Sequence, residues 1–169
     1  MRLPVLVLPA LLALAGFFPV APAQAFESEL LGKRDVDVAA YKSEQGALLF
    51  NEKGEQTGFA IDYGGYKKNY VILLMRDTGA KTNTDSSVFE IVQVVRAPKP
   101  KGLDLYTVGC HLKPATEAPA GQYVFAYAQF KPDGDGTPSA IKGAWMFDWQ
   151  TQRIVAIPDA KVDCREPGD

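Results

Sequence analysis

Histidine and cysteine are scarce in this chain of 169 residues, which contains one histidine and two cysteines. A metal site built from several histidines is therefore excluded by count, because zinc and similar metals draw most of their ligands from these residue types. The sequence also lacks the Gly-x-Ser-x-Gly motif that exposes the nucleophile of many hydrolases. We predict no catalytic residue, no metal ligand and no cofactor, and we interpret the protein as a non-enzyme.

One route to enzyme chemistry stays open in the sequence. Two carboxylates that approach one another could act as acid and base on a glycosidic bond, and Glu90, Asp104, Asp148 and Asp159 are candidates. Their spacing along the chain does not show that any two of them converge.

A large excess of charge of either sign is also missing. The chain has 18 Lys and Arg against 20 Asp and Glu, which gives a formal net charge of −2. Binding to a phosphate backbone depends on an excess of basic residues, so nucleic acid is a poor candidate partner. Aromatic residues make up 11% of the chain, which favours a folded domain over disorder.

Long uninterrupted apolar runs are missing as well, and the nearest approach to one lies at the amino terminus. Arg2 precedes an apolar stretch from Leu3 to Ala21, and Ala23-Gln24-Ala25 ends it with the small-x-small pattern of a signal-peptidase site. A membrane anchor is the alternative, but prolines interrupt the stretch and no basic cluster follows it. We therefore predict a cleaved signal peptide over residues 1–25 and a single β domain over residues 26–169, located in the periplasm or secreted, with no membrane span after cleavage.

The two cysteines are Cys110 and Cys164, which lie 54 residues apart. In an oxidising compartment their default fate is an intramolecular disulfide. For a loop of this length the chain-entropy model gives about 4 kcal/mol of stabilisation. A pair of reactive thiols is the alternative, but redox pairs normally have the close spacing Cys-x-x-Cys.

Apolar residues after residue 45 recur with a period of two, which is typical of β-strands. The first two expected strands flank the turn sequence Asn51-Glu52-Lys53-Gly54-Glu55 and should form a hairpin. We predict a mainly β fold, a single antiparallel sandwich or small barrel of about seven or eight strands, with one disulfide. One short amino-terminal helix is expected, either within Glu27–Lys33 or as a turn around Val36–Glu44. The expected strands are Gly46–Phe50, Thr57–Tyr63, Tyr70–Met75, Val88–Arg96, Leu103–Leu112, Gln122–Phe130, Ile141–Trp149 and Arg153–Ile157, with a short edge segment at Val162–Cys164.

Side-chain alternation predicts which faces of these strands are buried. Tyr70–Met75 is apolar on both faces and should be a central strand. In Leu103–Leu112 the alternation turns Cys110 into the core, so we expect a buried disulfide. His111 then points to the opposite face, where we expect an ordinary surface or rim residue. Contact with a partner or pH sensing is the alternative for this histidine.

A calcium site is suggested by Asp133-Gly134-Asp135-Gly136, since carboxylates two residues apart can converge on one cation. The rest of an EF-hand loop is missing, because Thr137 and Pro138 stand where a ligand and a glycine are needed. A polar hairpin turn is the favoured interpretation.

Three loops carry the residues that we expect to contact a partner. One follows the glycines of Tyr63-Gly64-Gly65-Tyr66, and it combines tyrosine with lysine, a composition common at interfaces. A plain hairpin turn is the alternative there. The other two loops are Arg76–Ser87 and Lys113–Gly121, whereas for Arg96–Lys101 a solvated, proline-stiffened loop is favoured over docking of an acidic partner. The candidate partner-binding residues are Tyr66, Lys67, Lys68, Arg76, Asp85 and Lys113.

Two classes of function fit this sequence. The favoured class is an exported module that binds another envelope protein, such as an inhibitor or immunity protein that inserts a loop into an envelope hydrolase. Small exported lysozyme inhibitors and secretion-system immunity proteins are similar to this chain in size and expected location, although none of their motifs is found in it. The second class is a periplasmic small-ligand or lipid carrier with a β-barrel cavity lined by aromatic strand residues.

Overall fold

The computed structural model describes residues 25–115, 120–130 and 136–165. The predicted signal peptide over residues 1–25 therefore lies almost wholly outside the described residues, and so do Asp133 to Asp135 of the rejected calcium loop. Among the described residues, no helix has the length and apolar character needed to cross a membrane.

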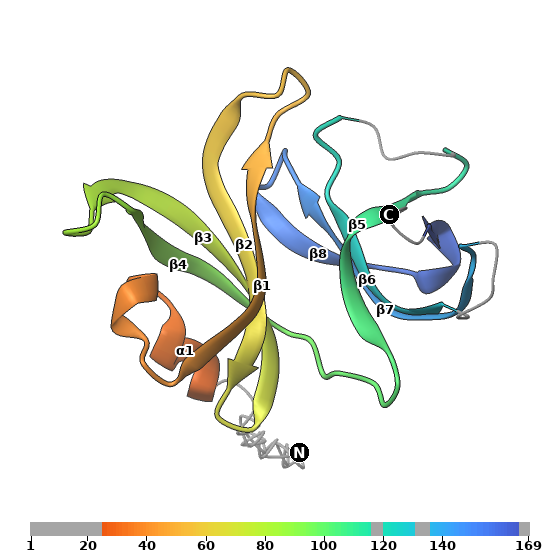
Figure 1. Ribbon diagram of the computed structural model, residues 1–169, viewed down its shortest axis with the longest axis horizontal. Helices are drawn as coiled ribbons and strands as arrows, with labels where there is room; N and C mark the ends of the chain where they lie inside the picture. Colours follow the sequence, from red (N-terminus) through yellow and green to blue (C-terminus); the bar gives the residue numbers. More distant parts are fainter. Residues whose placement is uncertain (1–24, 116–119, 131–135, 166–169) are drawn as a thin grey trace, which may run out of the picture.

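Two antiparallel sheets make up most of the fold, as expected for a mainly β protein (Figure 1). The first sheet has the order β1-β2-β3-β4, and the second has the order β8-β7-β6-β5-β9. The strands of the first sheet are β1 (Tyr41–Phe50), β2 (Gln56–Tyr66), β3 (Asn69–Lys81) and β4 (Ser87–Arg96). Those of the second are β5 (Asp104–Leu112), β6 (Val124–Phe130), β7 (Pro138–Asp148), β8 (Arg153–Ile157) and β9 (Val162–Cys164).

The expected hairpin around Asn51–Glu55 is confirmed, and both of its strands are longer than predicted. Asn51 explains the tight turn, because its side-chain oxygen accepts hydrogen bonds from the backbone N–H groups of Lys53 and Glu55. The short amino-terminal helix is also confirmed as α1 (Ala25–Leu30). A 3-10 turn, η2 (Asp35–Asp37), follows it, and a second one, η3 (Asp159–Lys161), precedes β9.

A shared core fills the space between the two sheets. The first sheet contributes Ile61, Tyr63, Ile72 and Leu74, and the second contributes Phe125, Tyr127, Trp145 and Phe147. At one side of this core, a glutamine side chain joins the sheets. Gln93 on β4 donates to the carbonyl of Ile154 on β8 at 3.0 Å and accepts from the N–H of the same residue at 2.8 Å. The amide thereby satisfies backbone groups at the edge of β8 that would otherwise need water.

The other face of the first sheet is buried as well. Val71, Leu73 and Met75 of β3 lie in a second cluster with Leu30 of α1, which is fully buried. The segment after α1 pairs with β4, since Gly32 donates to the carbonyl of Ile91 and Ile91 donates to that of Lys33. The prediction that Tyr70–Met75 is a central strand with two apolar faces is therefore confirmed.

The other face of the second sheet surrounds the disulfide. Cys110 and Cys164 are directly opposite residues of β5 and β9, and both are buried among Val124, Ala126 and Val162. The predicted disulfide and its burial are both confirmed.

The expected position of His111 is wrong. Its side chain is 2% exposed, so it is neither a surface nor a rim residue. The alternation argument assumed that the face opposite the disulfide is open, whereas both faces of this sheet are covered. The Nε2 atom of His111 lies 3.9 Å from a carboxylate oxygen of Asp163, its cross-strand neighbour on β9.

The connection between the two sheets is fixed at Ala97, directly after β4. Its side chain is fully buried, its N–H donates to the carbonyl of Tyr70, and its carbonyl accepts a hydrogen bond of 2.6 Å from the Tyr127 hydroxyl. The Tyr127 hydroxyl is also hydrogen-bonded to that of Tyr63, at 2.9 Å. Pro98 follows Ala97, and because proline has no N–H, strand pairing ends there.

Removing the disulfide should lower the free energy of unfolding by about 4 kcal/mol, since the closed loop restricts the unfolded chain. We expect this for the double variant Cys110→Ala/Cys164→Ala, measured by urea denaturation. A change below about 1 kcal/mol would contradict the assigned role of the disulfide.

Removing the Tyr127 hydroxyl should destabilise the fold, because the buried carbonyl of Ala97 would lose its hydrogen-bond donor. We expect Tyr127→Phe to lower the free energy of unfolding by about 1–3 kcal/mol in urea titrations. Tyr70→Phe is the matched control, because the Tyr70 hydroxyl forms no hydrogen bond with a described residue. An equal loss of unfolding free energy in the two variants would show that the hydrogen bond to Ala97 does not stabilise the fold.

Candidate functional site

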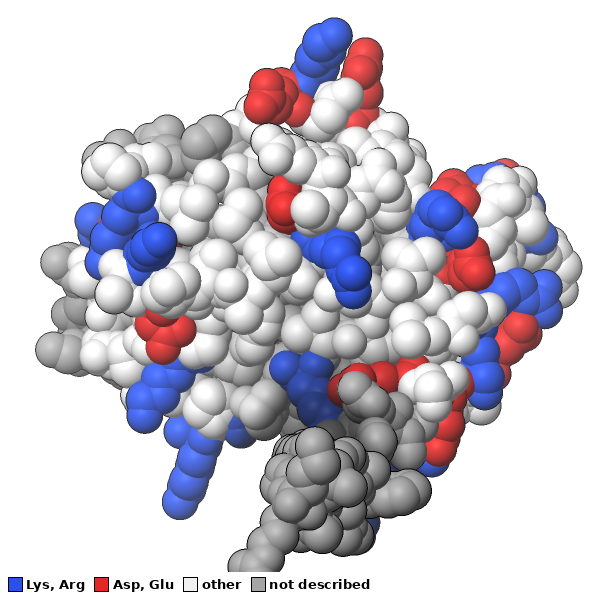
Figure 2. Space-filling model, turned by 180° about the vertical axis from the view of Figure 1, so that it is seen from behind, with Lys and Arg blue, Asp and Glu red and all other residues white. Residues whose placement is uncertain are grey.

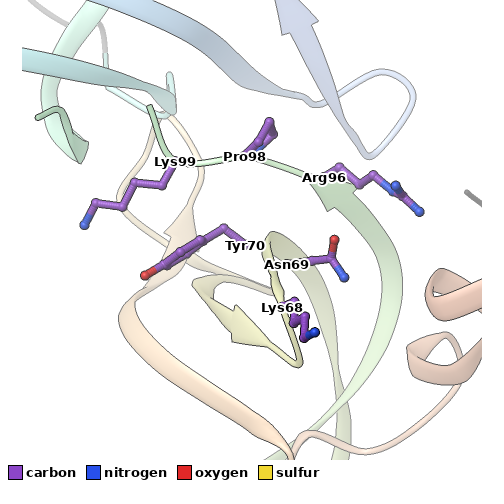
Figure 3. Close-up of a pocket in the computed structure, with 6 residues that line it drawn as sticks. All are labelled: Lys68, Asn69, Tyr70, Arg96, Pro98 and Lys99. Carbon is purple, nitrogen blue, oxygen red and sulfur yellow. The ribbon is translucent and has the colours of Figure 1, made fainter. Parts of the chain in front are cut away.

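Two basic segments that are far apart in the sequence meet at one end of the first sheet. The β2–β3 turn brings Lys67 and Lys68, and the end of β4 with the segment after it brings Arg96 and Lys99. Figure 3 shows Lys99 and Arg96 extending in opposite directions from this segment, with Tyr70 and the β2–β3 turn beside them. We call this surface the basic cleft; it has a volume of about 360 Å³ and is lined by Lys68, Asn69, Tyr70, Arg96, Pro98 and Lys99.

A second hollow of about 470 Å³ continues the basic cleft toward β1. It shares Lys68, Asn69 and Tyr70 with the cleft and adds Lys42 and Lys67, together with one carboxylate, that of Glu44. Five cations therefore border one continuous surface. Seen from the side opposite to Figure 1, basic and acidic side chains are scattered over the face, with uncharged surface between them (Figure 2).

Backbone hydrogen bonds fix both walls of the cleft. On one wall Lys67 and Lys68 form a two-residue turn between Tyr66 and Asn69, which are paired residues of β2 and β3. Lys67 has a φ of 55°, a conformation that a residue with a side chain seldom adopts. On the other wall, Ala97 is bonded to Tyr70 through its N–H, which sets the position of Pro98.

Carboxylates hold three of the five cations in place. Arg96 pairs with Glu27 at 2.9 Å, and its guanidinium lies 4.3 Å from the centre of the Phe26 ring. Lys99 pairs with Asp104 at 3.1 Å, and this hydrogen bond raises the pKa of the Lys99 ammonium.

Glu29 of α1 holds the third cation. Lys67 and Tyr66 both donate to its Oε2 atom. These bonds lower the pKa of Glu29, and the same carboxylate raises the pKa of Lys67. Lys42 and Lys68 form no ion pair with a described residue, so the cleft combines positioned cations with lysines available to a ligand.

The structure separates the six residues predicted to bind a partner. Lys67 and Lys68 border the cleft, whereas Arg76 lies within β3 and pairs with Glu90 at 2.9 Å. Asp85 is exposed in the β3–β4 turn, at the opposite end of the same sheet from the cleft. Lys113 follows β5 in the second sheet, where its N–H donates to the carbonyl of Lys161. The loop Lys113–Gly121 is described only in part, because residues 116–119 lie outside the described residues.

Tyr66 is not an exposed contact residue, contrary to the sequence-based expectation. It is 6% exposed and packs with Leu30 and Val71 in the core beneath α1. The turn that follows it is exposed, but α1 covers the tyrosine itself.

Asn69 and Tyr70 were not among the residues predicted to bind a partner, although they belong to the same tyrosine- and glycine-rich segment, and Arg96–Lys101 was predicted to be a solvated loop. A usable signal was present, because Arg96, Lys99 and Lys101 are basic residues within six positions, stiffened by prolines. What the sequence did not show is that this segment lies beside the Lys67-Lys68 turn.

Ser139 and Lys142 have the Ser-x-x-Lys spacing of some acyl-transfer enzymes, but they do not form a nucleophile and base. They lie on strand β7, where residues an odd number apart tend to face opposite sides. The Ser139 hydroxyl donates to the backbone carbonyl of Gln129 at 3.0 Å. Across the described ranges, no group of at least three His, Cys, Asp or Glu side chains is arranged to hold a metal ion.

Comparison with protein-family models, with curated proteins and with solved structures finds no match to this chain.

Replacing Tyr66 by alanine should open a cavity beneath α1 and remove the bond to Glu29. We expect Tyr66→Ala to lower the free energy of unfolding by about 3 kcal/mol, measured by urea denaturation. Lys68→Ala, two residues later and exposed, should change it by less than about 0.5 kcal/mol. Similar values for the two variants would contradict the core position of Tyr66.

Proposed function

We propose that this protein is an exported, non-enzymatic module that binds another envelope protein, and that its basic cleft receives an acidic segment of that partner. The convergence of the Lys67-Lys68 turn with Arg96 and Lys99 carries the proposal. Charge complementarity of this kind speeds association and selects partners more than it adds affinity. The acids that pair with these cations are partly or fully exposed, and ion pairs at the surface contribute little, so a partner carboxylate can compete for the cations.

The rigidity of the cleft supports a binding role. Its walls are β-strand ends fixed by paired backbone and by the buried Ala97, so few groups have to be ordered when a partner docks. Tyr70 adds an aromatic surface next to the cations, since its ring lies 5.8 Å from the Lys99 ammonium. An aromatic ring beside cations is frequent among residues that dominate binding energy.

The disulfide between Cys110 and Cys164 is compatible with an oxidising, exported location. Together with the signal-like amino terminus, this supports a periplasmic or secreted protein. In that compartment we favour an inhibitor or immunity protein that acts on an envelope hydrolase. Such a protein would cover an acidic active-site entrance with its basic cleft.

The carrier hypothesis receives less support from the packing. A carrier needs a cavity within or between its sheets, but aromatic side chains such as Phe125, Tyr127 and Phe147 fill the space between them. The far face of the first sheet is covered by α1, and that of the second surrounds the disulfide.

Reversing the charge of Lys42 and Lys68, which form no ion pair with a described residue, should weaken partner binding without disturbing the fold. We expect the mature protein, residues 26–169, to capture a stoichiometric partner from envelope extract and to inhibit a hydrolase among a panel of lysozymes and peptidoglycan amidases. With Lys42→Glu/Lys68→Glu, capture and inhibition should fall at least tenfold. The control Lys53→Glu/Lys142→Glu, which has the same charge change outside the cleft, should behave as the unchanged protein.

Two results would count against the proposal. Equal loss in the cleft variant and in the control would show that only net charge matters. Co-purification of a lipid or other small molecule, with no protein captured, would favour the carrier.

A further inference from the structure

A third hollow lies on the far face of the first sheet, between η2 and β1, and is separate from the basic cleft and from the hollow that continues it. Its volume is about 270 Å³. The floor is apolar and is formed by Leu73, Met75 and Ile91, all of which are buried. Val36 lies at the hollow and is 55% exposed, an uncommon position for a large apolar side chain.

Two carboxylates lie in the wall of this hollow, that of Asp35 on η2, which accepts a hydrogen bond from the N–H of Phe89, and that of Asp62 on β2. The Oδ1 atom of Asp62 accepts hydrogen bonds from the Tyr41 hydroxyl at 2.8 Å and from the Ser43 hydroxyl at 2.9 Å. Both hydroxyls come from β1 and both reach Oδ1, and the backbone N–H of Tyr63 also stabilises the charged carboxylate. No lysine or arginine of the described chain forms an ion pair with Asp62.

The surroundings of Asp62 disfavour a negative charge on its carboxyl group. Burial raises the pKa of the Asp62 carboxyl despite the two hydroxyl bonds, and the charge of Asp35 on η2 raises it further. A half-buried carboxylate without a counter-charge costs free energy, and a cation placed beside it would recover part of that cost. The hollow therefore has the electrostatics of a cation site above an apolar floor.

We propose that this hollow binds an alkylammonium group of the kind carried by a lysine side chain. The aliphatic stem would lie on Leu73, Met75 and Ile91, with Val36 covering it, and the ammonium would reach Oδ2 of Asp62. A compact ammonium fits better than a guanidinium, because the planar fork of arginine pairs best with two free carboxylate oxygens. The proposal does not depend on the basic cleft or on the proposed function.

The test uses Nα-acetyl-lysine methylamide as the probe and follows the backbone amide signals of the protein by NMR. We expect saturable shifts confined to the surroundings of Tyr41, Ser43 and Ile91. Nα-acetyl-norleucine methylamide, which keeps the stem and lacks the ammonium, should bind at least tenfold more weakly. Asp62→Asn, which keeps the size of the side chain and removes its charge, should weaken the lysine probe by at least tenfold.

Two controls keep the proposal falsifiable. Asp159→Asn removes an exposed carboxylate near the second sheet and should leave binding unchanged. Val36→Lys places an ammonium of the protein itself at the hollow and should block the probe even if Asp62→Asn does not fold. Equal binding of the norleucine probe, unchanged binding to Val36→Lys, or shifts located elsewhere would overturn the proposal.

A comparison with n-butylammonium distinguishes the source of the cation. Tighter binding of the lysine probe would identify a lysine of a partner chain, and equal binding would identify a free aliphatic amine. Both results support the pocket. Because the basic cleft has no part in these measurements, their failure would leave the proposed function standing.

Discussion

The rest of the structure depends on how Ala97 is held between the two sheets. Its N–H is bonded to Tyr70 of β3 and its carbonyl to the hydroxyl of Tyr127 of β6, while its own side chain is fully buried. These bonds end the first sheet, fix where the chain crosses to the second, and place Pro98 and Lys99 in the basic cleft. The same two bonds therefore link the packing of the core to the geometry of the surface site.

Each sheet is covered on both faces, and this explains the two residues whose positions were wrongly expected. Alternation along a strand tells which side chains share a face, but it does not tell whether the second face is open to water. α1 closes the far face of the first sheet over Tyr66, and β9 pairs with β5 at the edge of the second sheet beside His111. Both residues are buried, and the segments that contact them are far away in the sequence.

Charge is arranged differently at the two surface hollows. At the basic cleft, Glu27, Glu29 and Asp104 hold cations in defined positions while leaving them exposed. At the hollow beside η2, Asp62 is half-buried and accepts hydrogen bonds from the hydroxyls of Tyr41 and Ser43. The first surface presents positive charge, and the second presents the carboxylates of Asp35 and Asp62 above an apolar floor.

The sequence by itself determined the local features of this protein. The period of two specified the strands, Asn51–Glu55 specified the first hairpin, and two cysteines in a chain with a signal-like start specified the disulfide. These features depend on neighbouring residues or on a count, so they can be derived without knowing the fold. Only the tertiary structure decided which surfaces exist. The fold brings Lys67 and Lys68 close to Arg96 and Lys99, and it half-buries Asp62 beside Leu73. Both arrangements depend on contacts between segments that are distant in the sequence, and the sequence does not show how close such segments lie in space.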